Sequence, residues 1–309
     1  MNLSWRRAWL QALLCLLCMG GMAVAHGANL FVYCDQTLEL SAAQKNRLLL
    51  LADTVRDELQ RSGEGSAIIS RSAINLDRFQ IRYSHAGLAV RNDSRPHSSI
   101  WRVRQLFYRC EKDKPDIFDQ GIAGFLLDND SASMAYVSLV FVPGTLGLEM
   151  RRAALDDTLS SHLLGQHYSA NAYPFSTQFQ NCNQWLMEML AFAWGQLSLK
   201  DDVRAAAQQW LRQSDYRPTD IEVQHDYLMW ASHFIPLLHD EDHPAVNLEK
   251  NLYQVTMPAS IESFIHRRDP ESYRVELCMN EEHIVVHPGW SRIADGCVAA
   301  SGDRVLPVN

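Results

Sequence analysis

The segment that most constrains the fold is Gln180–Gln184, followed at once by the apolar run Trp185–Trp194. The run is helix-length and almost free of charge, so we expect a helix buried over most of its circumference. Asn181 is a good N-cap, because its side-chain oxygen can accept a hydrogen bond from an otherwise unpaired backbone N–H. Cys182 then falls in the first turn, where the helix dipole favours the thiolate. A nucleophilic thiol and a structural cysteine, buried or in a disulfide, both fit this position.

The first residues predict export. Arg6 and Arg7 precede the apolar stretch 8–22, and the small-x-small sequence 23–25 follows. This is the pattern of a secretory signal peptide, with cleavage expected near Ala25. We therefore expect a signal peptide over residues 1–25 and a periplasmic protein in a Gram-negative host, or otherwise a secreted one. No later stretch is long and apolar enough to predict a transmembrane segment in the mature chain.

Composition fits a globular protein, with 47% hydrophobic and 21% charged residues. The remaining length of about 280 residues is enough to bury a large core. We see no internal repeat and no linker, and so predict a single domain over residues 26–309 with helical and C-terminal elaborations. The formal net charge is −8 and there is no basic run. Such a chain is a poor candidate for binding nucleic acid.

Cysteine usage points to one thiol. Five cysteines follow the predicted signal peptide, and an odd number in an oxidising compartment leaves at least one without a partner in the chain. Cys278 and Cys297 are close in sequence and are natural partners. Cys34 and Cys110 would then pair, which leaves Cys182 free. The spacing allows other pairings.

Hydrophobic periodicity predicts a mixed set of helices and strands. Helices are expected at 41–61, 145–165, 182–194, 201–213, 226–238 and 258–266. Strands are expected at 67–71, 81–91, 100–107, 134–142, 252–256, 273–278 and 283–287, with another candidate at 121–127. The strand at 134–142 is apolar nearly throughout, so we place it centrally in the sheet. Residues 168–180 are expected to form an ordered loop that leads into the Cys182 helix.

The strands at 81–91 and 100–107 predict a hairpin with functional side chains. Alternation along the first strand places Tyr83, His85 and Gly87 on one face, and the return strand can direct Gln105 to the same side. Gly87 removes a side chain beside His85 and leaves room for a neighbour or a ligand. The hairpin therefore brings an imidazole and an amide together.

Cysteine catalysis needs a thiolate, a base and a group that orients the base. Cys182 would supply the thiol, His85 the base, and Gln105 an acceptor for one imidazole N–H. Backbone N–H groups at the head of the Cys182 helix would form part of an oxyanion hole. Tyr83 and Asn181 are the weaker candidates for further contacts to the oxyanion or substrate.

Each of these residues has a plainer interpretation. His85 can be a satisfied core histidine, and Gln105 can simply complete a hydrogen-bond network. His97 and His162 are alternative bases, although loop and helix-surface positions suit them less. The cluster His239–His243 offers metal ligands, but its consecutive spacing fits no defined coordination pattern. We expect a solvated loop there, no metal site and no cofactor.

Three segments in a fixed order carry a family resemblance. The Ser84–Val90 strand, the following strand Trp101–Leu106, and later Asn181–Trp185 resemble the circularly permuted branch of the NlpC-type papain-like superfamily, to which lecithin:retinol acyltransferase belongs. In ordinary papain-like enzymes the cysteine precedes the histidine, whereas here the order is reversed, as permutation predicts. The whole chain, including Tyr173–Thr177 and Val255–Ile261, looks like a bacterial domain-of-unknown-function family, number 2145.

The resemblance implies an α+β fold of the circularly permuted papain-like type, in which an antiparallel sheet packs on a central Cys-bearing helix, with extra helices. It implies that Cys182 is the nucleophile, His85 the base and Gln105 the third polar group. Relatives often have histidine or an acid at the third position, so Gln105 departs from the pattern and leaves retained activity in question. The expected substrates are amides or acyl esters of small molecules, peptides or lipids, including cell-wall peptides.

Two other classes of protein remain as alternatives. A non-catalytic periplasmic binding or assembly module can keep the papain-like shell, and the glutamine at the third position is compatible with it. A redox or metal protein is less favoured, because the sequence has no Cys-x-x-Cys motif.

Overall fold

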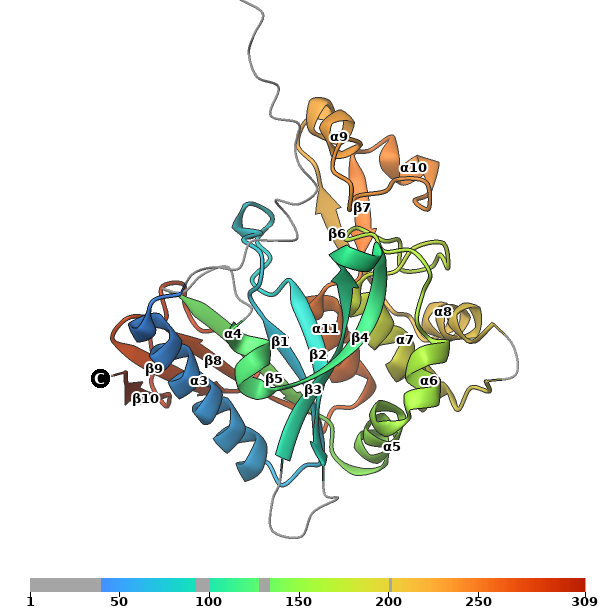
Figure 1. The fold of residues 1–309 in the computed structure, drawn as a ribbon. Coiled ribbons are helices and arrows are strands. Elements are labelled where there is room, and N and C mark those ends of the chain that lie inside the picture. The colour runs from blue at the N-terminus through green and yellow to red at the C-terminus, as the bar shows by residue number, and fades with distance from the viewer. Residues whose placement is uncertain (1–39, 93–99, 128–133, 200–201, 309) are drawn as a thin grey trace, which may run out of the picture. The chain divides into compact units, whose positions relative to one another are not determined.

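An eight-stranded antiparallel sheet forms the centre of the fold (Figure 1). A computed structural model describes residues 40–92, 100–127, 134–199 and 202–308, which lie in one compact unit. The predicted signal peptide lies outside these residues. The strand order is β10-β9-β8-β5-β1-β2-β3-β4. The strands are β1 (Ser66–Arg71), β2 (His85–Asn92), β3 (Ile100–Arg109), β4 (Lys114–Gly121), β5 (Ala135–Phe141), β8 (Tyr273–Met279), β9 (His283–Pro288) and β10 (Arg304–Pro307).

The sheet is apolar on both faces, which explains why its inner strands have nearly continuous apolar sequences. On one face Ile68, Leu88 and Val140 belong to a core that includes most of helix α7 (Cys182–Gly195). The alternate residues of the same strands face a second core formed with helix α3 (Ala42–Arg61). Strand β5 pairs with β1 and β8, as its apolar sequence predicted.

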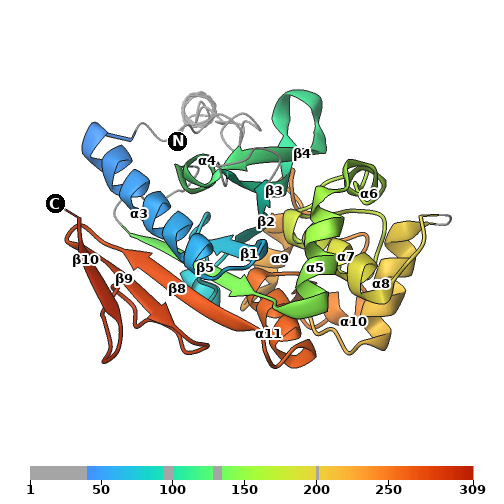
Figure 2. The ribbon, with the colours of Figure 1, turned by 90° about the horizontal axis from the view of Figure 1, so that it is seen from below.

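Helices cover both faces of the sheet (Figure 2). One face packs against α7 together with α5 (Gly144–Leu155), α6 (Asp157–His162) and α11 (Pro258–Arg268), and α8 (Val203–Gln213) packs on α7. The other packs against α3 and α4 (Ile122–Leu127). Helix α7 is buried along almost all of its length, which confirms the expectation from its apolar run. The fold is thus α+β, with a large antiparallel sheet packed on the helix that carries Cys182.

A smaller two-stranded sheet stands apart from the large one. Strand β6 (Thr219–Glu222) pairs with β7 (Leu252–Val255). Between them lie α9 (Asp226–Ser232) and α10 (Ala245–Leu248), and a small core of their own includes Met229 and Tyr253. Helix α9 ends at Ser232, so it is shorter than the helix predicted at 226–238.

Three predictions about elements were wrong. Of the strand candidate 121–127, residues 122–127 form α4, because their apolar side chains pack with α3 on one face of the sheet. The predicted helix at 145–165 is two helices, because the Asp156 side chain accepts a hydrogen bond from the Leu159 N–H and starts α6 anew. Strand β2 begins at His85, and Ile81 forms only an isolated bridge with Leu76.

The cysteines follow the predicted pattern as far as the described residues show it. Cys278 and Cys297 form a disulfide, which confirms that pairing. Cys182 is a free thiol and is buried. Cys110 is also disulfide-bonded, whereas Cys34, its predicted partner, lies outside the described residues. In the described part of the chain, no helix combines the length and the apolar character that crossing a membrane requires.

Candidate active site at the head of helix α7

Helix α7 begins at Cys182 because Asn181 caps it. The Asn181 side chain accepts a hydrogen bond from the Gln184 N–H at 2.7 Å, and its amide donates to the Ala170 carbonyl at 3.3 Å. The N-cap prediction is thus confirmed, and both ends of the Asn181 amide are engaged in holding the helix start. Cys182 is the first helical residue and is 7% exposed.

The structure brings Cys182, His85 and Gln105 together; we call these three residues the Cys182 cluster. The Nδ1 atom of His85 lies 3.0 Å from the Cys182 Sγ, and its Nε2 lies 2.5 Å from Gln105 Oε1. Because an amide oxygen only accepts hydrogen bonds, the imidazole proton belongs on Nε2. The lone pair of Nδ1 then faces the thiol. The arrangement has the connectivity of a nucleophile, a base and an orienting group.

Gly87 makes room for this cluster. A Cβ atom at this position would lie 2.7 Å from Val103 Cγ1, 3.0 Å from the Arg104 carbonyl oxygen and 3.3 Å from Gln105 Cβ. Strands β2 and β3 can therefore approach closely here only because residue 87 has no side chain. The space expected to hold a neighbour or a ligand is occupied by β3 itself.

Aromatic rings enclose the imidazole. The ring of His85 lies 5.4 Å from that of Phe107, edge-on, and 5.8 Å from that of Phe125. Burial and, to a smaller extent, the positive charge of Arg71 lower the pKa of His85 to about 3, although the hydrogen bond that its Nε2 donates to Gln105 acts in the opposite direction. The imidazole is therefore neutral at ordinary pH, as a proton acceptor must be.

The thiol of Cys182 is neutral as well. Burial raises its pKa to about 12, although the backbone N–H of Asn183, the charge of Arg71, and the backbone N–H groups of Cys182 and Ala86 all act to lower it. We expected the start of the helix to favour the thiolate, and this holds for the backbone N–H groups but not for the thiol as a whole. The N–H groups do favour the anion, but the loss of water outweighs them in the resting protein.

The side chains of the two weaker candidates, Tyr83 and Asn181, have other partners in the structure, and that of Asn181 caps α7. The hydroxyl of Tyr83 donates to Glu276 on β8. Tyr168 is the tyrosine within electrostatic range of Cys182: burial raises the pKa of its hydroxyl, and a Cys182 thiolate raises it further. Sequence reasoning missed Tyr168 because nothing in the loop 168–180 distinguishes it from its aromatic neighbours.

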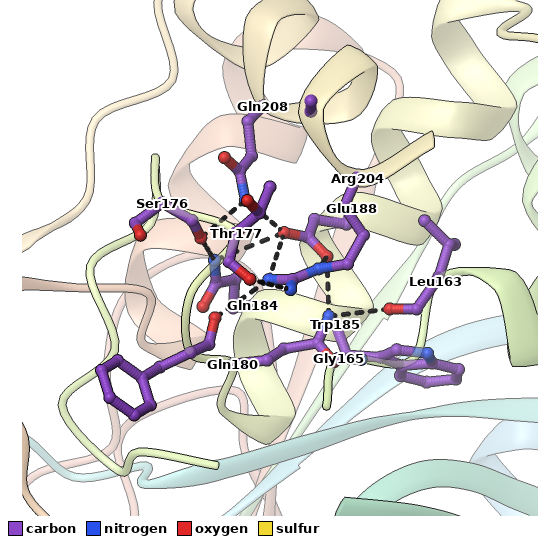
Figure 3. Close-up of polar contacts among 12 residues, drawn as sticks. Leu163, Gly165, Ser176, Thr177, Gln180, Gln184, Trp185, Glu188, Arg204 and Gln208 are labelled. Carbon is purple, nitrogen blue, oxygen red and sulfur yellow. Dashed lines mark hydrogen bonds and ion pairs between the residues drawn. The ribbon is translucent and has the colours of Figure 1, made fainter. Parts of the chain in front are cut away.

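A second set of buried polar residues anchors α7 between one and two turns further along (Figure 3). The carboxylate of Glu188 is fully buried and accepts hydrogen bonds from Arg204, with Nε at 2.9 Å, and from three glutamine amides. These side chains join the loop before α7 and helix α8 to α7. We call this set the Glu188 cluster; it consists of Gln180, Gln184, Glu188, Arg204 and Gln208. Its one signal in the sequence is the charge of Glu188 inside an apolar run.

The alternative candidates lie elsewhere. His162 is exposed at the end of α6, where its Nδ1 contacts the Thr158 carbonyl oxygen at 2.8 Å. His97 lies outside the described residues. We expected a solvated loop at His239–His243, but its last residue, His243, is buried. The Nε2 atom of His243 lies 2.7 Å from the Asn171 carbonyl oxygen.

A depression of about 500 Å³ opens beside the Glu188 cluster rather than at the thiol. Loop 168–180 and α8 form most of its wall. Its lining residues are Tyr173, Phe175, Ser176, Thr177, Ala205, Gln208, Gln209, Arg212 and Asp242. Neither Cys182 nor His85 lines it, so we assign it no part in the thiol chemistry.

Comparison with known proteins gives a family and no more. A family model described as "Uncharacterized protein conserved in bacteria (DUF2145)" matches residues 58–265. This range covers more than half of the chain and contains all three residues of the Cys182 cluster. No curated protein and no solved structure matches the chain.

Proposed function

The chain belongs to the DUF2145 family of bacterial proteins, and we propose that it is an exported cysteine hydrolase or acyltransferase that acts on an amide or an acyl ester. Cys182 is the nucleophile, His85 the general base, and Gln105 holds the imidazole. The observation that carries the proposal is the continuous line of contacts from Sγ through both imidazole nitrogens to the Gln105 amide.

The reaction proceeds in two transfers. His85 Nδ1 removes the thiol proton as Cys182 Sγ attacks the carbonyl carbon, and the carbonyl oxygen takes the negative charge. The same proton then passes to the leaving amine or alcohol as the bond to it breaks, which leaves a thioester on Cys182. Water, or an acceptor alcohol or amine, attacks the thioester by the same route and regenerates the thiol. Backbone N–H groups at the head of α7 are the donors nearest to the developing oxyanion.

The arrangement of elements supports assignment to the circularly permuted papain-like architecture. The histidine strand β2 precedes the cysteine helix α7 in the chain, and the next strand, β3, supplies the third polar group. The sheet is antiparallel and packs directly on α7. These relations are those that the resemblance implies, so we extend it to the fold type as part of the proposal.

Export is supported by chemistry within the chain. Cys278 and Cys297 form a disulfide, and disulfides form and persist chiefly in oxidising compartments. The basic, apolar and small-residue sequence over residues 1–25 supplies the corresponding leader. In a bacterial periplasm, a cell-wall peptide is the natural amide substrate.

The test is acylation of the purified mature protein by p-nitrophenyl acetate, which transfers its acetyl group to a thiolate and releases p-nitrophenolate. We expect a hydroxylamine-sensitive acetyl adduct that peptide mass mapping places on Cys182. Cys182→Ala should lose it. His85→Ala should form it roughly 10²–10⁴ times more slowly, because the general base is missing. His162→Ala, which removes an exposed histidine, is the matched control and should behave as wild type.

One observation favours a second candidate, a non-catalytic binding module with the same shell. Cys182 is only 7% exposed, and burial raises its pKa to about 12. Equal acetylation of wild type and Cys182→Ala, with no adduct on residue 182, would reject the enzyme and favour the module.

A further inference from the structure

Three polar side chains are joined by hydrogen bonds at the edge of the large sheet that β8, β9 and β10 form (Figure 2). The imidazole of His287, near the end of β9, contacts both of the others. Its Nδ1 lies 2.5 Å from Asp303 Oδ1, and its Nε2 lies 2.7 Å from Ser291 Oγ. We call these three residues the Ser291 cluster. It lies outside the range that the family model matches.

The two partners of the His287 imidazole determine where its proton lies. An ionised carboxylate only accepts hydrogen bonds, so Nδ1 carries the proton and donates it to Asp303. In the neutral imidazole the lone pair of Nε2 then faces Ser291, whose hydroxyl donates to it. This is the hydrogen-bond pattern of a Ser-His-Asp triad, in which the carboxylate fixes the tautomer and stabilises the imidazolium. The Cys182 cluster, by contrast, has a neutral amide in the place of the carboxylate.

Exposure increases from the carboxylate to the hydroxyl. The side chain of Asp303 is 2% exposed and that of His287 is 16% exposed, whereas Ser291 is an exposed residue. The second carboxylate oxygen of Asp303 accepts a hydrogen bond from the Ala300 N–H at 2.7 Å, so both oxygens are held in place. A fixed and shielded carboxylate behind a hydroxyl that solvent reaches is the order that attack on an external substrate requires.

The segment that carries Ser291 is fastened to the sheet on both sides of this residue. Before it, Nη1 of Arg274 donates to the Trp290 carbonyl at 3.0 Å. After it, the Ile293 N–H donates at 2.8 Å to the carboxylate of Glu276, which is fully buried. The disulfide of β8 closes the same segment onto the sheet a few residues later. The hydroxyl is therefore presented between fixed points, which keeps it aligned with the imidazole.

The surroundings of the cluster leave room and donors for a substrate. Gly289 has a φ of +120°, and a Cβ built on it would have only His287 Nε2 as a neighbour within 4 Å, at 3.9 Å. The space beside the base is thus open on this side. The backbone N–H groups of Ser291 and Arg292 donate to no acceptor in the part of the chain that the structure describes. They are available to hydrogen-bond an oxyanion that forms next to the hydroxyl.

We propose that the Ser291 cluster is a second hydrolytic site, which cleaves a small carboxylic ester. Ser291 Oγ attacks the carbonyl carbon as His287 Nε2 takes the hydroxyl proton, and the carbonyl oxygen takes the negative charge. The proton then passes to the leaving alcohol as its bond to the carbonyl carbon breaks, which leaves an acyl ester on Ser291. Water attacks this ester by the same route, releases the carboxylic acid and restores the hydroxyl. Asp303 is the positioning residue for the imidazole.

The exposure of Ser291 argues for an ester rather than an amide. Solvent weakens the electrostatic stabilisation of an oxyanion at an exposed site, because the dielectric constant there is high. Such a site suits a substrate whose leaving group departs readily, and an alcohol departs from a carbonyl carbon more readily than an amine does. The proposal is independent of the chemistry of Cys182, since neither site uses a residue of the other.

The test uses the full mature chain carrying Cys182→Ala, so that the thiol cannot contribute. Diisopropyl fluorophosphate transfers its phosphoryl group to an activated serine and releases fluoride. We expect one adduct, which peptide mass mapping places on Ser291, and slow hydrolysis of p-nitrophenyl acetate that the reagent abolishes. Adding Ser291→Ala should remove both. Ser263→Ala is the matched control, because this exposed serine donates its hydroxyl to the Ala259 carbonyl instead of a histidine.

Variants of the other two residues test their separate roles. His287→Gln removes the base and should slow both reactions roughly 10²–10⁴-fold. Asp303→Asn keeps the shape but no longer fixes the tautomer, so it should lower kcat for p-nitrophenyl acetate about 10²–10⁴-fold and leave KM within about twofold. A residue that only braced the fold would change KM or the urea midpoint instead of kcat alone.

Two outcomes overturn the inference. Absence of an adduct on Ser291, in protein whose circular dichroism is that of wild type, shows that the hydroxyl is not activated. An adduct that forms in His287→Gln at the rate of its parent shows that Ser291 is merely accessible and that the cluster is not a triad. Neither outcome affects the proposed function, which the acetyl adduct on Cys182 tests in the wild-type chain.

Discussion

Helix α7 carries two buried polar clusters that differ in charge and in hydrogen bonding. In the Glu188 cluster a fully buried carboxylate accepts hydrogen bonds from an arginine and three glutamines. In the Cys182 cluster two neutral groups and an amide are joined by only two contacts, and the Gln105 amide nitrogen has no partner among the described residues. A saturated network holds a helix in place, whereas a sparse one leaves a lone pair and a proton available for chemistry.

The largest expected effect follows from breaking the saturated cluster. Glu188→Ala leaves the Arg204 guanidinium buried without its counter-ion, and this should lower the free energy of unfolding by about 3–5 kcal/mol. Urea denaturation at neutral pH measures it. The double variant Glu188→Leu/Arg204→Met removes both charges and should be less destabilised than the single variant. Equal destabilisation of the two would show that the ion pair does not dominate the cluster.

The next effect concerns the neutral cluster and pH. Burial lowers the pKa of His85 to about 3 from its ordinary value of 6.5, so between these values the unfolded chain binds a proton that the native protein does not. The stability associated with the neutral imidazole is present above pH 6.5 and is lost as pH falls toward 3. Relative to His85→Gln, wild type should therefore lose about 3 kcal/mol of unfolding free energy between roughly pH 7 and pH 4.

Urea denaturation of both proteins at each pH measures this difference. His162→Gln, at an exposed position, serves as the control and should follow wild type. A parallel decline of wild type and His85→Gln would mean that His85 is protonated in the native protein.

A smaller effect is expected where β2 and β3 meet at the Cys182 cluster. The Cβ of Gly87→Ala would press on Val103 and on the Arg104 carbonyl, and the strands must separate to admit it. We expect a loss of about 1–3 kcal/mol in urea denaturation and slower acetylation of Cys182, because Gln105 moves with β3. Gly121→Ala is the matched control, since its Cβ meets nothing within 4 Å. Wild-type acetylation in Gly87→Ala would show that the cluster tolerates movement of β3.

The smallest expected effect is at the helix start between the two clusters. Asn181→Ala removes the acceptor for the Gln184 N–H and should lower the free energy of unfolding by about 1 kcal/mol. Asn181→Asp retains the acceptor and should stay close to wild type. Urea denaturation of the three proteins separates capping from any loss of the amide contact to Ala170.

Sequence reasoning reached the Cys182 cluster because its signals are local. The apolar run and Asn181 predict where α7 begins, and alternation along two strands places His85 and Gln105 on one side. The order of these residues in the chain then carried the family resemblance. Each of these signals depends on residues within one element or one hairpin, so the hydrophobic periodicity of the sequence is enough to predict it.

Features that depend on distant partners were not predictable. Strand β4 is polar and half-exposed, and pairing with β3 alone makes it a strand. The partners of Glu188 come from a loop and from α8, so the sequence shows the charge but not its network. The direction of the Cys182 pKa depends on how deeply the helix start is buried, which no local pattern reports. Arg71 faces His85 only through the pairing of β1 with β2.

Burial of the Cys182 thiol has a further consequence for oxidative folding. Disulfides rearrange through attack by a thiolate, so a thiol that stays protonated is a poor partner in thiol–disulfide exchange. Because burial raises the pKa of Cys182 to about 12, the native protein can keep this thiol reduced beside the Cys278–Cys297 bond without reshuffling it. His85 and Cys182 are 97 residues apart, and this protection begins only when β2 meets α7. Until then, Cys182 is as open to mispairing as the other cysteines of the chain.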